Sequence, residues 1–168
     1  MLRLFRSALV LFTLLTVPLR ANLGETVKEC VTRYGTPVGY SEASAKVPFG
    51  TNDFSATGYT LIVFLLNDKE VGARISKQDK SAFTDTERQN IMNADLAGST
   101  WTSAPSDDPT CLRWIRGDKA TVLYDKVNRV LIFTSPDMAQ ALHSAPAKPA
   151  APAPATATSP VDAGKTSP

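Results

Sequence analysis

Few side chains in this 168-residue chain are suited to catalysis or metal binding. The only histidine is His143, and the only thiols belong to Cys30 and Cys111. Catalytic triads need a base held rigidly beside a nucleophile, and structural zinc sites need four cysteine or histidine ligands. His143 lies in an Ala- and Pro-rich segment that we expect to be unstructured. The sequence therefore predicts neither a catalytic triad nor a zinc site.

The carboxylates offer one further route to chemistry. Asp107 and Asp108 are adjacent in a polar loop, and Asp125 lies near the end of a strand pattern. A two-carboxylate hydrolase needs a cleft that holds the two groups at a fixed separation. A small domain with one sheet rarely provides such a cleft, so we interpret the Asp pair as a solvated turn, with calcium ligation as the alternative. No glycine pattern fits a phosphate loop, and we predict no enzyme activity, metal or cofactor.

The tripeptide Arg116-Gly117-Asp118 is one that integrins recognise. Here it lies between two strand-like runs, and Gly-Asp is common in hairpin turns. We therefore predict a turn at this position.

The first 21 residues have the three-part order of a secretory signal peptide. A short basic segment precedes the apolar run over residues 7–17, and a proline leads to the small residue Ala21. This order is typical of a leader that is removed during export. We expect residues 1–21 to be cleaved off, so that a secreted or periplasmic protein begins at Asn22. The alternative is an uncleaved anchor, although a spanning helix needs about 20 apolar residues.

The net charge of the mature chain argues against nucleic acid as a partner. The whole chain has 18 basic and 16 acidic side chains. Arg3, Arg6 and Arg20 lie in the leader, which has no acidic residue, so 15 basic side chains remain against 16 acidic ones. A domain with a net charge of −1 has no long-range field to attract a phosphate backbone.

Residues 22–134 are expected to form one domain, which is long enough for a single core. Helices are expected at residues 26–34 and 85–96. Each begins with a capping box, Thr26 with Glu29 and Thr84 with Glu87. Strands are expected at residues 38–46, 54–66, 71–76, 111–116, 120–124 and 129–134, with a further extended piece from Trp101.

Short links between these strands predict antiparallel hairpins. The expected fold class is α+β, with two short helices packed on an antiparallel sheet and a helix-plus-strands unit that is repeated twice. Residues 135–168 are rich in Ala, Pro, Ser and Thr. They lack the large apolar side chains that would offset the entropy of ordering them. We expect a disordered tail, either a tether or a dispensable extension.

Two sets of residues resemble known families. Gly24-Glu25-Thr26, Val31 and Tyr34-Gly35-Thr36-Pro37 resemble the first helix of small exported domains with a β-lactamase-inhibitor-like fold. Cys30 with Arg33-Tyr34-Gly35, the helix before Trp101 and Trp114-x-Arg116-Gly117-Asp118 resemble uncharacterised small secreted bacterial proteins. The resemblance implies a helix-plus-hairpin unit repeated around one curved sheet. It does not extend to the inhibitory loops, so it does not imply β-lactamase binding.

The two cysteines are expected to form a disulfide. An even number of cysteines in an exported chain favours pairing, here of Cys30 with Cys111. Such a bond would tie the first helix to the second half of the chain. The alternative is two buried free thiols.

The central strand suggests a candidate binding face. Tyr59, Leu61, Val63 and Leu65 alternate with a second set, and we expect them to face the helices. The second set, Ile62, Phe64 and Leu66, would then lie on the open face, joined by Trp114. Large apolar patches of this kind mark interaction sites. The alternative is that the sheet curls, or that residues 38–52 fold over this patch, and so buries these side chains.

These observations favour an exported, non-enzymatic binding domain whose partner is an envelope or secreted protein. The alternative is a structural component of the cell envelope that is held by its tail.

Overall fold

The computed structural model describes residues 21–44, 47–95 and 97–144. In this part of the chain the helices are α1 (Val27–Tyr34), α2 (Asp85–Ala94) and α3 (Pro136–Ser144). The strands are β1 (Gly39–Ser41), β2 (Gly50–Ala56), β3 (Tyr59–Leu66), β4 (Lys69–Lys77), β5 (Trp101–Ala104), β6 (Cys111–Arg116), β7 (Thr121–Asp125) and β8 (Val130–Thr134). The predicted combination of helices with an antiparallel sheet is confirmed. The leader up to residue 20, and residues 145–168 of the tail, lie outside the described residues.

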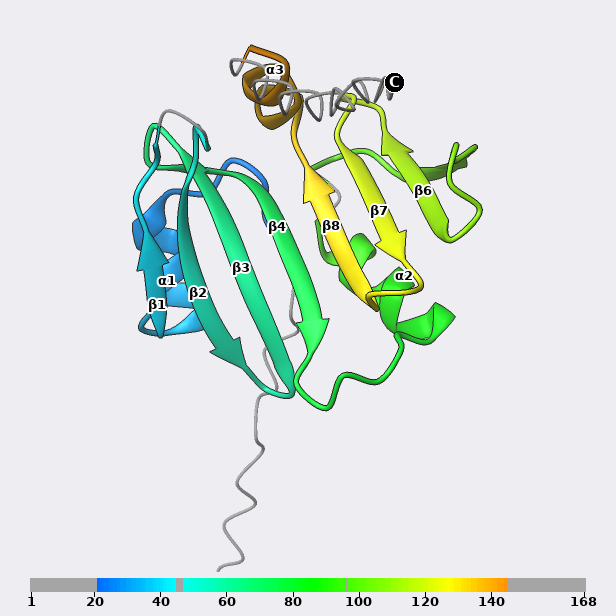
Figure 1. Cartoon of the computed structure of the whole chain (residues 1–168), viewed down its shortest axis with the longest axis horizontal. Helices are drawn as coiled ribbons and strands as arrows, with labels where there is room; N and C mark the ends of the chain where they lie inside the picture. The colour runs from blue at the N-terminus through cyan, green and yellow to red at the C-terminus, as the bar shows by residue number, and fades with distance from the viewer. Residues whose placement is uncertain (1–20, 45–46, 96, 145–168) are drawn as a thin grey trace, which may run out of the picture.

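All eight strands form one antiparallel sheet in the order β1-β2-β3-β4-β8-β7-β6-β5. Two runs of four consecutive strands meet at the pairing of β4 with β8, where Gly72 lies opposite Thr134 and Ser76 opposite Val130. Along the chain, each run follows one helix. Figure 1 shows α1 behind the first run and α2 behind the second, so that the facing side of the sheet is open over much of its area.

Both predicted capping boxes are present. The Thr26 hydroxyl accepts from the Glu29 N–H, and the Glu29 carboxylate accepts from the Thr26 N–H. Thr84 and Glu87 form the same pair of bonds at the start of α2. Gly35 ends α1 with a φ of 89°, a left-handed conformation that favours glycine.

The main core lies on the side of the sheet that faces α1 and α2. On β3, Leu61 and Val63 are fully buried while Ile62 between them is half-buried, because successive strand residues point to opposite faces. Helix residues Cys30 and Met92 belong to the same cluster. Its other buried members include Phe54, Ile75, Ile91, Val122, Leu131 and Phe133. Burial of each large side chain stabilises the fold by about 1.5–3 kcal/mol.

A β-bulge creates a second, smaller core on the opposite face. The pairing of β3 with β4 shifts by one residue after Phe64, which leaves Val71 without a partner residue. Val71 packs with Phe49 and with Met138 of α3. The packing is close, since a Cβ atom on Gly72 would lie 2.3 Å from the Met138 sulfur.

Three expectations about the elements are wrong. The strand expected over residues 54–66 is a hairpin, in which Thr57-Gly58 turns β2 into β3 with a φ of 80° at Gly58. Helix α3 occupies the start of the expected tail, so the domain extends beyond residue 134. His143 therefore lies on a helix rather than in an unstructured segment, with its side chain exposed.

No helix in the described ranges is long and apolar enough to cross a bilayer.

Candidate functional site

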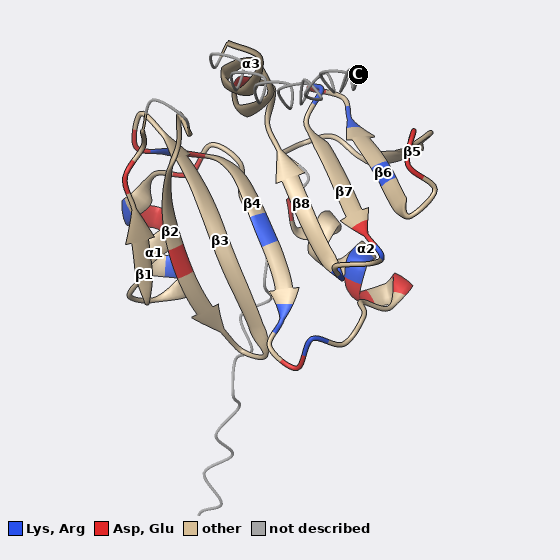
Figure 2. Cartoon of the chain, in the orientation of Figure 1, with Lys and Arg blue, Asp and Glu red and all other residues tan. Residues whose placement is uncertain are grey.

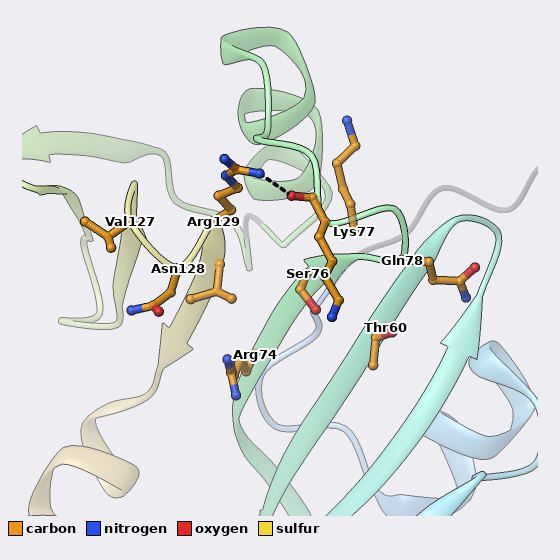
Figure 3. Close-up of a pocket in the computed structure, with 10 residues that line it drawn as sticks. Thr60, Arg74, Ser76, Lys77, Gln78, Val127, Asn128 and Arg129 are labelled. Carbon is orange, nitrogen blue, oxygen red and sulfur yellow. Dashed lines mark hydrogen bonds between the residues drawn. The ribbon is translucent and has the colours of Figure 1, made fainter.

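A hollow of about 440 Å³ opens on the sheet face opposite α1 and α2. Figure 3 shows it between the ends of β3 and β4 and the turn that joins β7 to β8. Its polar lining residues are Thr60, Arg74, Ser76, Lys77, Gln78, Lys80, Asn128 and Arg129. Val127 and Val130 complete the lining.

The strand register places several of these lining side chains on the open face of the sheet. Thr60 lies opposite Ser76, which in turn lies opposite Val130 on β8. Arg74 is two residues before Ser76 on the same strand and so points to the same face. The floor of the hollow therefore spans β3, β4 and β8 and includes the pairing of β4 with β8, where the two runs meet.

Loop hydrogen bonds fix the walls. The Gln78 N–H donates to the Gly58 carbonyl (2.9 Å), which holds the chain after β4 against the β2–β3 turn. Nη1 of Arg129 donates to the Lys80 carbonyl (2.8 Å) and so links the two walls, as Figure 3 shows. In the β7–β8 turn, Asp125 Oδ1 accepts from the Asn128 N–H (2.8 Å).

The hollow is cationic, and Figure 2 shows the basic residues of β4 in blue. Lys77 points away from it toward α2 (Figure 3) and pairs with Glu87 at 2.6 Å, an interaction that raises the pKa of Lys77. The side chains of Arg74, Lys80 and Arg129 are exposed and lie within 4 Å of no carboxylate in the described part of the chain. Hydrogen bonds from Asn128 are the main cause of the lowered pKa of Asp125, and Arg74 adds a smaller effect.

The lining is suited to binding an anion. It contains guanidinium, ammonium, amide and hydroxyl groups but no carboxylate, thiol or imidazole. Guanidinium groups donate charge-assisted hydrogen bonds to carboxylates and phosphates, often two at once. The arrangement can therefore hold an anionic group.

The structure divides the four residues of the expected apolar face. Phe64 lies on the open face but packs against Phe49, with ring centroids 6.3 Å apart, and belongs with Leu66 to the small core under α3. Ile62 lies on the same face, opposite Arg74. Trp114 lies on the other face, in register with the buried Val122, and packs against the main core. Its inclusion in the open face was wrong.

The predicted disulfide between Cys30 and Cys111 is also wrong, since both cysteines are free. The Cys30 sulfur donates to Glu70 at the start of β4 (3.5 Å). Cys111 lies on β6, in register with Ser76 across β7 and β8. Six residues of strand separate Ser76 from Glu70, about 20 Å, whereas a disulfide needs Cα atoms within about 7 Å.

A second polar group is buried behind β4. Single ligand atoms of Glu25, Cys30 and Glu70 lie within 4.8 Å of one another, a spacing that could hold a metal ion. Glu25, however, is already engaged by an ion pair with Arg33. Burial raises the pKa of Glu70 to about 8 and that of Cys30 to about 12, and the nearby Glu70 charge adds to the shift of Cys30.

A third cluster of polar side chains includes Arg116 and Asp118 of the Arg116-Gly117-Asp118 tripeptide and shows that both have a structural role. Arg116 is 3% exposed and donates to Asp118 through Nε and Nη2, at 3.0 and 2.9 Å. Its Nη1 pairs with Asp95 at 2.9 Å. Asp108, in the other polar loop, is exposed and accepts from the Thr110 N–H, as in a solvated turn.

Sequence reasoning missed the cations of the hollow and the buried acids Glu70 and Asp95. Arg74 could have been found, because it interrupts an apolar strand at an outward position. Glu70 could not be assigned to a face, because the bulge at Val71 breaks the alternation of β4.

Comparison with known proteins identifies no family. No family model and no curated protein matches the chain. One similar solved structure is an extracellular protein containing a SCP domain from Bacillus anthracis str. Ames, with 7% identity and a TM-score of 0.41, covering 70% of this chain and 45% of that one. Another is a cysteine-rich secretory protein from Staphylococcus aureus subsp. aureus Mu50, with 11% identity and a TM-score of 0.38, covering 69% and 45%. The chain spans less than half the length of either.

Proposed function

We propose that this chain is an exported binding domain that holds an acidic segment of an envelope or secreted protein in the cationic hollow. The observation that carries the proposal is the convergence of Arg74, Lys80 and Arg129 on one hollow whose lining has no carboxylate. Here a carboxylate in the hollow would meet donors from both walls.

Apolar groups at the rim extend the proposed contact. Val127 is 69% exposed at the β7–β8 turn, and half-buried Ile62 lies opposite Arg74 on the open face. An occupant that combines carboxylates with an apolar side chain would contact both kinds of surface. Because the mature chain has a net charge near zero, recognition would depend on this local charge rather than on long-range steering.

The proposal includes an architecture. We infer that two helix-plus-four-strand units, with α1 and α2 packed on the same side of the sheet, arose as a repeat of the β-lactamase-inhibitor-like kind. The order of elements supports this, since each run of four strands follows one helix. Export is supported by the leader pattern of residues 1–21.

A titration with short peptides tests the function. Hexaglutamate added to the ¹⁵N-labelled domain is expected to shift the amide signals of Ser76, Gln78 and Asn128, and salt at about 0.5 M is expected to suppress the shifts. The double variant Arg74→Gln/Arg129→Gln is expected to lose them. Arg113→Gln is the matched control, because Arg113 lies on the same face but outside the hollow.

Two results would contradict the proposal: equal shifts with hexaglutamine, or shifts that survive the double variant. The alternative function, a structural envelope component held by its tail, predicts co-sedimentation with cell-wall or outer-membrane material. That co-sedimentation would be lost on removal of residues 145–168 and kept in the arginine variant.

A further inference from the structure

The segment before α1 is fixed to the start of β4 by main-chain hydrogen bonds. The Gly24 N–H donates to the Glu70 carbonyl (2.8 Å), and the Glu70 N–H donates to the Glu25 carbonyl (2.7 Å). The backbone nitrogen of Asn22 is thereby held 3.2 Å from Oε1 of Glu70. Its side-chain amide donates to Oε1 of Glu25 at 2.5 Å. Asn22 is therefore anchored independently of the residues that precede it.

The carboxylate that faces Asn22 has no countercharge. Glu70 is 1% exposed, and its two oxygens accept from the Asn22 N–H and the Cys30 thiol. No ion pair reaches it within the described ranges, and the nearby Arg33 is held by Glu25. Burying a charge without a partner is costly, so Glu70 either keeps a proton, as its raised pKa indicates, or gains a cation beside it.

A second buried carboxylate, that of Asp95, lies near the same segment. A hollow of about 440 Å³ is bordered by Asn22, Leu23 and Asp95, among others. Asp95 is 3% exposed, and while its Oδ1 pairs with Arg116, its Oδ2 has no hydrogen-bond partner of normal geometry in the described part of the chain. Burial raises the pKa of Asp95, although Arg116 opposes the shift.

We propose that Glu70 binds the chain's own α-ammonium group, which cleavage after Ala21 creates on Asn22, and that the charge of Asp95 adds to the negative potential there. Two independent observations agree on this atom. The leader pattern places the cut after Ala21, and the fold places the next nitrogen against a buried carboxylate without a countercharge. Hydrolysis consumes one water, leaves the new carboxylate on Ala21 and gives the amine, protonated, to Asn22.

The proposal links leader removal to a stable fold. Ala21 is fully buried, so its peptide bond must be cut before the domain folds around it. A chain that keeps the leader folds with an amide nitrogen at this site and an uncompensated acid beneath it. A chain that has lost the leader places a positive charge there, which pairs with Glu70.

A double-mutant cycle tests the pairing. The mature chain from Asn22 to Pro168 is prepared with a free or an acetylated α-amine, each with Glu70 or with Glu70→Gln. Acetylation is expected to lower the folding equilibrium constant at least about tenfold when Glu70 is present and to have little effect in Glu70→Gln. Glu42→Gln, which removes an exposed carboxylate, is the matched control and should respond like the parent chain.

A second measurement tests the same pairing without the Glu70→Gln variant, in case that variant does not fold. The ¹³C signal of the Glu70 carboxyl is titrated in the free and acetylated mature chains. The free amine is expected to move its titration to lower pH, because a nearby positive charge favours the carboxylate. Equal titrations, an acetylation effect that is the same in both backgrounds, or a natural mature chain that starts elsewhere than Asn22 would each overturn the proposal.

Discussion

Arg116 is more enclosed than any other cation in the described ranges. Its guanidinium group contacts Asp95 and Asp118 and lies over the Trp101 ring, 4.9 Å from the centroid. Trp101 in turn donates to the Met92 carbonyl at the end of α2 (2.8 Å). The arginine therefore joins the α2 end to β5 and β6, and it is not available to an external receptor.

Replacing Arg116 by alanine is expected to destabilise the domain by about 3 kcal/mol or more, because Asp95 would remain buried without its partner. Urea unfolding at neutral pH measures the change. Asp118→Asn is the control: its carboxylate is 48% exposed, and an exposed ion pair contributes less than about 1 kcal/mol. A loss for Arg116→Ala no larger than for the control would show that the pair is not structural.

In the acetylated mature chain the nitrogen of Asn22 is an uncharged amide. For this form, the two buried acids predict how the stability of the fold changes with pH. Burial raises the pKa of Glu70 from 4.5 to about 8, and that of Asp95 from 3.8 to about 6. The folded state therefore binds more protons than the unfolded state between these values. Stability is full below the unfolded pKa values and is expected to fall as the pH rises from about 3.8 to about 8.

Urea midpoints measured from pH 5 to pH 8 on the acetylated chain test this expectation. Of the other groups near Glu70, Asp95 titrates within this range, whereas burial raises the pKa values of Cys30 and Tyr34 above it, and Glu25 forms an ion pair with Arg33. The Glu70→Gln substitution should remove most of the fall in the urea midpoint over this pH range. A midpoint that rises with pH would contradict the assignment.

At the scale of elements, α3 is the least expected part of the fold. Met138, 7% exposed, contacts the small core that includes Phe49 and Val71. The helix therefore covers the upper part of the open face, including Phe64, and leaves the cationic hollow uncovered.

Met138→Ala is expected to lower stability by about 2 kcal/mol, because it leaves a cavity over Gly72. Leu142→Ala on the same helix, 52% exposed, should change stability by no more than about 0.5 kcal/mol. Thermal or urea unfolding of the two variants gives the comparison. Equal losses would mean that α3 does not depend on the Met138 contact.

The elements that could be predicted from the sequence are those whose start or end is determined by interactions between residues close together in the chain. Capping boxes mark both helix starts, because Thr26 and Thr84 bond within four residues of themselves. Helix α3 depends instead on a contact with Gly72, which lies more than 60 residues away in sequence, and no local pattern encodes it. The hollow was missed for the same reason: its walls come from three separate segments.

At the scale of the whole molecule, the chain that ends at Ser144 should be as stable as the full chain. Residues 145–168 are mainly Ala, Pro, Ser and Thr and offer little apolar surface to pack. Their removal is expected to change the Tm by no more than about one degree. A large drop, measured by calorimetry, would show that they contact the domain.

The pairing of β4 with β8 has a consequence for how the chain folds. Strands β1–β4 and β5–β8 each form from neighbours in sequence, and such local contacts form quickly. The contact between the two runs must wait for β8, the last of the described strands to leave the ribosome. Until then β4 presents an unpaired edge, the kind that pairs with other chains and aggregates. Slow synthesis of the second half therefore prolongs the interval in which a chaperone that covers strand edges would raise the yield of folded protein.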